Sequence, residues 1–265
     1  EEYEFAETSF HQIPTEDGFL MEAIVTKPLD FDESKTYPAW FRTYAGPHAP
    51  VVRNAWGRSR MTEQMLAQMG LVVFRMDPRS ASGKGAESAW TAYKQLGVQE
   101  MKDIEEGIQW LTKHDWVDAS RVGMHGHSYG GFMTAYALTH SKLFAAGISG
   151  APVTDWKYYD SIYTERYMQT PQENPDGYEG TSVAKAAENL HGKLLLLHGI
   201  MDDNVHLQNA TQLVKALQDT DKDFEVMFYP TMRHGLHGNH YDRLLVDFIR
   251  ESLGLESIGG SQESE

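Results

Sequence analysis

The stretch VGMHGHSYGGFMTA, residues 122–135, decides the fold. Its first four residues predict a buried strand, and the residues after Gly131 are typical of a helix. Between them lies the segment Gly126-His127-Ser128-Tyr129-Gly130, which has the pattern Gly-x-Ser-x-Gly. Between a strand and a helix, this pattern predicts a sharp turn that projects the hydroxyl of Ser128 from the end of a sheet.

The residues around Ser128 suit a nucleophile. Gly126 and Gly130 keep side chains away from the turn, and Gly131 lets the helix pack closely. The N-terminus of the helix presents backbone N–H groups, including that of Tyr129, to a developing oxyanion. Ser128 is therefore the candidate nucleophile, and the alternative is a purely structural turn.

The rest of the chain alternates strands with helices. Residues 8–13 and 19–27 flank a turn with Pro, Asp and Gly, and predict an antiparallel hairpin. Apolar strands are expected at residues 39–44, 71–76, 122–125, 145–149, 194–198 and 224–229. Helices are expected at residues 62–69, 98–114, 130–140, 206–218 and 239–253. The pattern predicts an α/β-hydrolase fold, a mostly parallel twisted sheet flanked by helices with antiparallel strands at its N-terminal edge.

The sequence has neither an internal repeat nor a long linker. Residues 1–265 are therefore expected to form one catalytic domain. Within it, residues 1–36 form a hairpin or linker region, and residues 257–265 are expected to be a disordered tail.

Composition excludes several classes of function. Lys and Arg number 23 against 38 Asp and Glu, and the net charge of −15 argues against nucleic acid or anionic lipid as the main partner. The sequence has no run of 18 apolar residues, so it predicts no membrane-spanning segment. The absence of Cys excludes disulfides, a thiolate nucleophile and Cys-type zinc sites. The acidic first four residues are not typical of a signal peptide, and the compartment stays open.

A serine hydroxyl needs a base that takes its proton. In α/β hydrolases the order along the chain is Ser, then Asp or Glu, then His. Asp202 follows the expected strand at residues 194–198, and His234 follows the strand at residues 224–229. We predict Ser128 as the nucleophile, His234 as the general base and then acid, and Asp202 as the carboxylate that orients the imidazole.

Other residues compete for these roles. Asp203 adjoins Asp202, but neighbouring side chains in a loop point in different directions, so we expect Asp203 to make structural contacts. His125 and His127 lie on the strand and turn of the nucleophile itself, where they fit structural or pocket-wall roles. His198 and His206 are also expected to be structural.

A metal site is the alternative for the histidines near the C-terminus. His234, His237 and His240 recur every three residues. However, Gly235 and Gly238 interrupt any helix that would align them, and no carboxylate is suitably spaced. We therefore expect neither a metal nor another cofactor.

The motifs also carry a family resemblance. From about residue 37 to residue 253, the chain resembles the catalytic domain of the prolyl oligopeptidase family, in its dipeptidyl-peptidase IV branch. The resemblance rests on residues 43–47 (TYAGP), 126–131 (GHSYGG), 151–153 (APV), 158–168 (YYDSIYTERYM), 198–206 (HGIMDDNVH) and 234–235 (HG). The tyrosine-rich segment and the string DDNVH are specific to that branch.

The resemblance implies a serine peptidase that cleaves peptides after Pro, Ala or another small residue through an acyl-enzyme. It implies an oxyanion hole formed by the hydroxyl of Tyr44 and the backbone N–H of Tyr129, and a packed aromatic is the alternative for Tyr44. Asn204 matches a position that binds a substrate carbonyl. A flat apolar pocket, suited to the pyrrolidine of Pro, is implied at Tyr129, Val153, Trp156, Tyr159, Tyr163 and Val205.

The chain departs from the family pattern in three respects. Residues 77–85, DPRSASGKG, carry Pro and Ser where the family has a Gly-rich loop, so we expect a stiffer loop. His127 stands where the branch commonly has Trp. Family members carry a β-propeller ahead of the hydrolase that holds the amino terminus of the substrate, and no blade periodicity is present in this sequence. The propeller is therefore expected in a full-length parent.

Several properties stay open at the level of sequence. Dipeptidyl specificity belongs to the resemblance, because the propeller would supply it. A general carboxylesterase and a non-catalytic binding module of the same fold are alternatives for the same residues. Family members often form homodimers through this domain, here through residues 239–253, whose apolar face suits the domain core equally well. A periplasmic or secreted location would agree with the resemblance.

Overall fold

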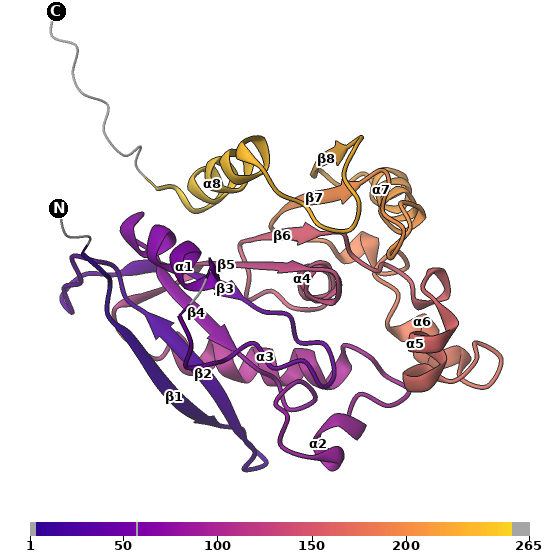
Figure 1. The fold of residues 1–265 in the computed structure, drawn as a ribbon, viewed down its shortest axis with the longest axis horizontal. Coiled ribbons are helices and arrows are strands. Elements are labelled where there is room, and N and C mark those ends of the chain that lie inside the picture. Colours follow the sequence, from indigo (N-terminus) through magenta and orange to yellow (C-terminus); the bar gives the residue numbers. More distant parts are fainter. Residues whose placement is uncertain (1–3, 57, 256–265) are drawn as a thin grey trace, which may run out of the picture.

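The computed structural model describes residues 4–56 and 58–255, with the backbone alone at residues 58–60. The predicted tail at residues 257–265 lies outside the described residues. In the described part, eight strands form one sheet in the order β1-β2-β4-β3-β5-β6-β7-β8 (Figure 1). They are β1 (Thr8–Pro14), β2 (Leu20–Thr26), β3 (Tyr37–Arg42), β4 (Val72–Met76), β5 (Val117–His127), β6 (Ala146–Gly150), β7 (Lys193–Gly199) and β8 (Glu225–Tyr229).

The pairing of the strands confirms the predicted fold class. β1 pairs with β2, and β2 with β4, in antiparallel orientation. The remaining neighbours, from β4 through to β8, are parallel. The carboxyl ends of six strands therefore meet at one edge of the sheet, where side chains from distant parts of the chain come together.

Helices cover both faces of the sheet. One face is covered by α3 (Val98–Leu111), α4 (Tyr129–His140) and α7 (Gln208–Asp219). The other is covered by α1 (Arg58–Gln68) and α8 (Asn239–Leu253). β7 shows the consequence for the sequence: Leu194 and Leu196 join the first buried cluster, and Leu195 and Leu197 join the second. A strand covered on both faces is apolar at every position.

The strands predicted from the sequence lie close to the observed ones, but several short elements were not predicted. β5 begins at Val117 rather than at residue 122, because Val117 pairs with Tyr37 before an irregularity in the register. Two 3₁₀ turns (Trp156–Tyr158 and Ala187–Asn189) and three helices were also missed: α2 (Ala86–Trp90), α5 (Ser161–Met168) and α6 (Pro175–Gly180).

Capping residues were the available signal for two of these helices. The Asp160 carboxylate accepts from the backbone N–H of Tyr163 at 2.8 Å, and Asn174 caps α6 in the same way at Gly177. These helices are too short for hydrophobic periodicity to appear.

The last helix, α8, has the bounds predicted for it. Its residues Phe248 and Ile249 are buried in the second cluster, and Tyr241, Leu244 and Leu245 pack against that cluster. The apolar face of the helix is thus used within the chain, and its role in dimerisation stays a prediction. No helix in the described ranges has the length and hydropathy needed to cross a membrane.

Candidate active site

Ser128 occupies the turn between β5 and α4 in a strained backbone conformation. Its φ of 60° and ψ of −119° lie outside the main allowed regions, and its N–H donates to the Gly150 carbonyl at 2.8 Å. A Cβ on Gly126 would lie 2.2 Å from the Gly130 carbonyl oxygen, and one on Gly130 would lie 2.6 Å from that of Thr43. The two glycines therefore let the backbone close tightly enough to hold Ser128 at the tip of the turn.

Asp202 and His234 meet in the loops that follow β7 and β8. His234 Nδ1 lies 2.8 Å from Asp202 Oδ2. The other carboxylate oxygen of Asp202 accepts from the backbone N–H groups of Asn204, at 3.0 Å, and Val205, at 2.9 Å. Because an ionised carboxylate only accepts, Nδ1 of His234 donates, and its Nε2 is left for another partner.

The competing residues have other partners. Asp203 makes an ion pair with Arg233 at the surface. His198 is fully buried, with its Nε2 2.8 Å from the Val205 carbonyl and 3.4 Å from Asp202 Oδ2. Burial is the main cause that lowers the pKa of His198. Its Nε2–H donates to the Val205 carbonyl and so holds the loop that presents Asp202.

Two further histidines lie beneath the turn. The His127 ring packs against the His234 ring, with centroids 4.9 Å apart. Burial, and next the charge of His234, lower the pKa of His127 to about 4. Burial, followed by the charges of Arg42 and His127, lowers the pKa of His125 to about 3. Both rings are therefore neutral at neutral pH and form walls of the site.

Tyr44 follows β3, and its side chain lies close enough to that of Ser128 for the two hydroxyls to interact. Burial raises the pKa of Tyr44, so its phenol keeps its proton and is able to donate. The Tyr44 ring also packs against the Tyr129 ring, with centroids 6.1 Å apart. The structure thus brings the two predicted oxyanion-hole residues together beside Ser128.

The predicted substrate-binding residues pack together in one apolar cluster, which we call the aromatic pocket after its predicted role. Its members are Tyr129, Val153, Trp156, Tyr159, Tyr163 and Val205. The Trp156 ring contacts those of Tyr129, Tyr159 and Tyr163 at centroid distances of 5.5, 6.1 and 6.2 Å. The two valines are buried in the same cluster. The Tyr159 hydroxyl donates to Asn204 Oδ1 at 2.8 Å, which joins the pocket to the loop that carries Asp202.

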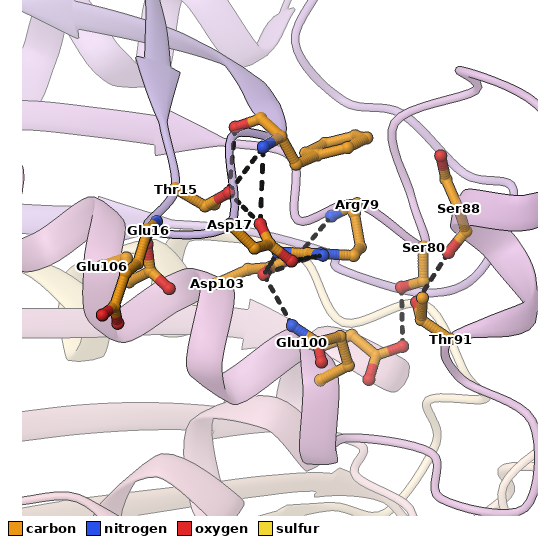
Figure 2. Close-up of polar contacts among 12 residues, drawn as sticks. Thr15, Glu16, Asp17, Arg79, Ser80, Ser88, Thr91, Glu100, Asp103 and Glu106 are labelled. Atoms are coloured by element: carbon orange, nitrogen blue, oxygen red, sulfur yellow. Dashed lines mark hydrogen bonds and ion pairs between the residues drawn. The ribbon is translucent and has the colours of Figure 1, made fainter.

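The loop that follows β4 is fixed by buried side chains that sequence analysis did not identify (Figure 2). Arg79 makes ion pairs with Asp103 on α3, at 2.9 Å, and with Asp17 in the β1–β2 turn, at 2.6 Å. The Ser80 hydroxyl donates to Glu100 Oε1 at 2.6 Å. The loop was predicted to be stiffer because it carries Pro and Ser, and these contacts provide a more specific reason for its order.

Glu100 is fully buried at the start of α3, and burial raises its pKa to about 7. Its second oxygen accepts from the backbone N–H of Gly97 at 3.0 Å. After burial, the charge of Glu100 is among the causes that raise the pKa values of Tyr129 and Tyr163. Glu100 therefore lies close enough to the aromatic pocket to influence it electrostatically.

The metal alternative has no geometric support in the described ranges. No group of three or more His, Asp or Glu side chains there could hold a metal ion. His240 Nδ1 instead lies 3.2 Å from the hydroxyl of Tyr229, away from a shared centre with His234.

The sheet order, the strained turn at Ser128 and the contact between Asp202 and His234 define the class of protein, an α/β hydrolase. The model of the prolyl oligopeptidase family matches residues 56–256. The chain belongs to this family.

Similar proteins agree with this membership. Dipeptidyl peptidase 8 from Homo sapiens and from Mus musculus is 37% identical over 247 residues, which cover 89% of this chain and 28% of each relative. The crystal structure of Porphyromonas gingivalis dipeptidyl peptidase 4 superimposes with a TM-score of 0.89 and 35% identity. That match covers 95% of this chain and 36% of the other. The chain thus spans little more than a quarter of the curated relatives that it matches.

Proposed function

We propose that the chain is the catalytic domain of a serine peptidase, with Ser128, His234 and Asp202 as its catalytic triad. The observation that carries the proposal is the 2.8 Å contact between His234 Nδ1 and Asp202 Oδ2, at the same sheet edge as the strained Ser128. Because Nδ1 is engaged by the carboxylate, Nε2 of His234 is the atom that takes the serine proton. Asp202 holds the ring and stabilises its positive charge.

Ser128 Oγ attacks the carbonyl carbon of the scissile bond as its proton passes to His234. The oxyanion that forms accepts hydrogen bonds from the Tyr44 hydroxyl and the Tyr129 N–H. The C–N bond then breaks, and His234 donates its proton to the leaving amine. Water, deprotonated by His234, hydrolyses the acyl-enzyme and restores Ser128.

The aromatic pocket supports cleavage after Pro or a small residue. A pyrrolidine ring fits a flat slot between aromatic rings, and Pro has no N–H that would need a partner there. Asn204 accepts a hydrogen bond from the Tyr159 hydroxyl, and we assign its amide N–H to the carbonyl of the preceding substrate residue. The pocket therefore takes the residue whose carbonyl carbon is attacked.

We extend the proposal to the release of dipeptides by the full-length protein. Its support is that relatives with 37% and 35% identity are named dipeptidyl peptidases. In the family, a β-propeller holds the substrate's free amino terminus, and a peptide held there reaches Ser128 with its second residue. We also propose that the full-length protein carries this propeller and forms a homodimer.

The test uses the protein at its full natural length with Gly-Pro-p-nitroanilide. We expect Ser128→Ala to lower kcat at least about 1,000-fold, whereas Ser34→Ala, a loop serine outside the site, leaves it unchanged. A fluorophosphonate should label the unaltered protein and fail to label Ser128→Ala. Hydrolysis of short acyl esters without Pro amides would indicate a carboxylesterase instead. Absence of labelling would indicate a binding module.

A further inference from the structure

A hollow lies beside Tyr44, with a volume of about 600 Å³. Its walls include Tyr44, Gly126 and His127, which precede or contact Ser128, and Gly235, which follows His234. No described residue of the aromatic pocket lines it. The hollow therefore opens onto the reacting centre from a different side.

Three arginines give this hollow its character, and we call it the arginine cavity: Arg42, Arg53 and Arg75. Arg42 is paired in register with Arg75 on β4 and with His125 on β5. Arg75, Arg42 and His125 therefore form one row across the end of the sheet. The side chains of Arg42 and Arg75 are 21% and 12% exposed, and Arg53 is exposed. Among the described lining residues, none has a carboxylate.

The nearby carboxylates sit behind the walls. Glu63 on α1 is 1% exposed, pairs with Arg75 and lies 3.9 Å from Arg42. Asp77 accepts from the backbone N–H groups of residues 51 and 52, and burial raises its pKa to about 6. Burial also lowers the pKa of Arg42 to about 10, which leaves it charged at neutral pH. The three arginines thus line the cavity, whereas Glu63 and Asp77 are not among its described lining residues.

The position of His234 decides which part of a substrate reaches the cavity. The general acid must lie beside the leaving amine, because it protonates that nitrogen. The cavity wall includes Gly235, one residue after His234, and His127, whose ring lies 4.9 Å from that of His234 at a tilted angle. The chain that follows the scissile bond is therefore the part that enters the arginine cavity.

We propose that the arginine cavity binds a carboxylate on the leaving-group side of the scissile bond. This rests on the proposed peptidase function and names a substrate class for it. The carboxylate is either the C-terminus of a tripeptide or the acidic side chain of the first residue after the bond. Guanidinium groups bind carboxylates through paired, charge-assisted hydrogen bonds, and a cavity of this volume is within the range of small-ligand sites.

Four peptides test the proposal on the full-length protein: Gly-Pro-Glu and Gly-Pro-Gln, each with a free or an amidated C-terminus. We expect kcat/KM to be about tenfold higher when the favoured carboxylate is present, the size of one hydrogen bond to a charged group. A preference for free over amidated peptides identifies the C-terminal carboxylate. A preference for Glu over Gln identifies the side chain. Mass spectrometry of the released Glu, Gln or amide gives the rates.

Arg53→Gln is the test variant, because Arg53 lines the cavity and is exposed. It should reduce the tenfold preference to about threefold or less. The matched control is Arg121→Gln, which removes the same charge near the opposite end of β5 and should leave the preference at tenfold.

Each outcome has a distinct meaning. Equal cleavage of all four peptides would overturn the proposal that the cavity binds a carboxylate, but not the proposed peptidase function. Equal loss of preference in Arg53→Gln and Arg121→Gln also overturns it, because the effect would then come from overall charge. Cleavage of none, without fluorophosphonate labelling, overturns the proposed function and this inference with it.

Discussion

The aromatic pocket and the arginine cavity lie on two sides of Tyr44, yet they differ in every physical respect. One is built from rings and buried valines that follow β5, β6 and β7. The other is built from arginines at the ends of β3 and β4 and in the loop after β3. Under the proposed function, the two halves of the sheet would present different chemistry to the two sides of one scissile bond.

This difference teaches how each side would discriminate between substrates. Apolar contacts scale with buried area and shape, and salt has little effect on them. Contacts between exposed charges are screened by salt and depend on ionisation. Selection by shape is therefore expected before the scissile bond, and selection by charge after it.

The largest expected effect concerns Glu100, a fully buried carboxyl near the aromatic pocket. Its pKa is raised from 4.5 to about 7 in the folded protein, so the folded state holds a proton that the unfolded state releases. The stability from this proton is fully present below pH 4.5 and is lost as pH rises through about 7. Relative to Glu100→Gln, the unfolding free energy should fall by roughly 3 kcal/mol between pH 4 and pH 8.

Urea titration of the full-length protein and of Glu100→Gln at several pH values measures this difference. The absolute stability of the variant is not the readout, since Gln replaces a group that accepts from both Ser80 and Gly97. The readout is the change with pH. Parallel curves for the two proteins would contradict a buried, protonated Glu100 and the charge-poor surroundings that it implies.

Tyr44→Phe tests the residue that lines the arginine cavity and packs against Tyr129 of the aromatic pocket. Loss of the hydroxyl removes one donor to the oxyanion, so kcat should fall about 100-fold. Since the oxyanion is common to all substrates, the loss should be equal for peptides with acidic and neutral leaving groups. Steady-state kinetics on the four tripeptides checks this. A loss confined to acidic substrates would place Tyr44 in the arginine cavity alone.

Tyr163→Ala tests the aromatic side alone. Removing the ring takes away apolar contact with Trp156 and with a bound Pro, so kcat/KM for Pro substrates should fall about 30-fold. The preference for a carboxylate after the bond should not change. Tyr93→Ala, which removes an exposed ring outside the pocket, serves as the control. A change in the acidic preference would show that the two regions are coupled.

Most of the fold was accessible from the sequence because the sheet is covered on both faces. Strands such as β7 then read as unbroken apolar runs, and α3 shows helical spacing at Met101, Ile104, Ile108 and Leu111. The segment between β6 and β7 was harder. Its helices are short and are specified by caps such as Asp160 and Asn174 rather than by periodicity.

The residues of the site also fall into those that the sequence predicted and those that it did not. The order Ser, Asp, His along the chain predicted that Asp202 and His234 would meet, and they lie in contact. Nothing in sequence spacing marked Arg42 and Arg75, which are 33 residues apart and become neighbours only through strand register. The same is true of Arg79, which reaches Asp17 across 62 residues. Long-range polar contacts need the register and the turn geometry, which a single sequence does not provide.

The smallest expected effect is the response of the two regions to salt. Raising the ionic strength from about 0.05 M to 0.5 M shortens the screening length to roughly 4 Å, so the preference for a carboxylate should fall about threefold. Arg42 and Arg75 are largely shielded from solvent, and their share of the preference should persist. The preference for Pro over Ala before the bond, set by the aromatic pocket, should stay constant or rise slightly. If both preferences fell together, charge and shape would not be separated across Tyr44.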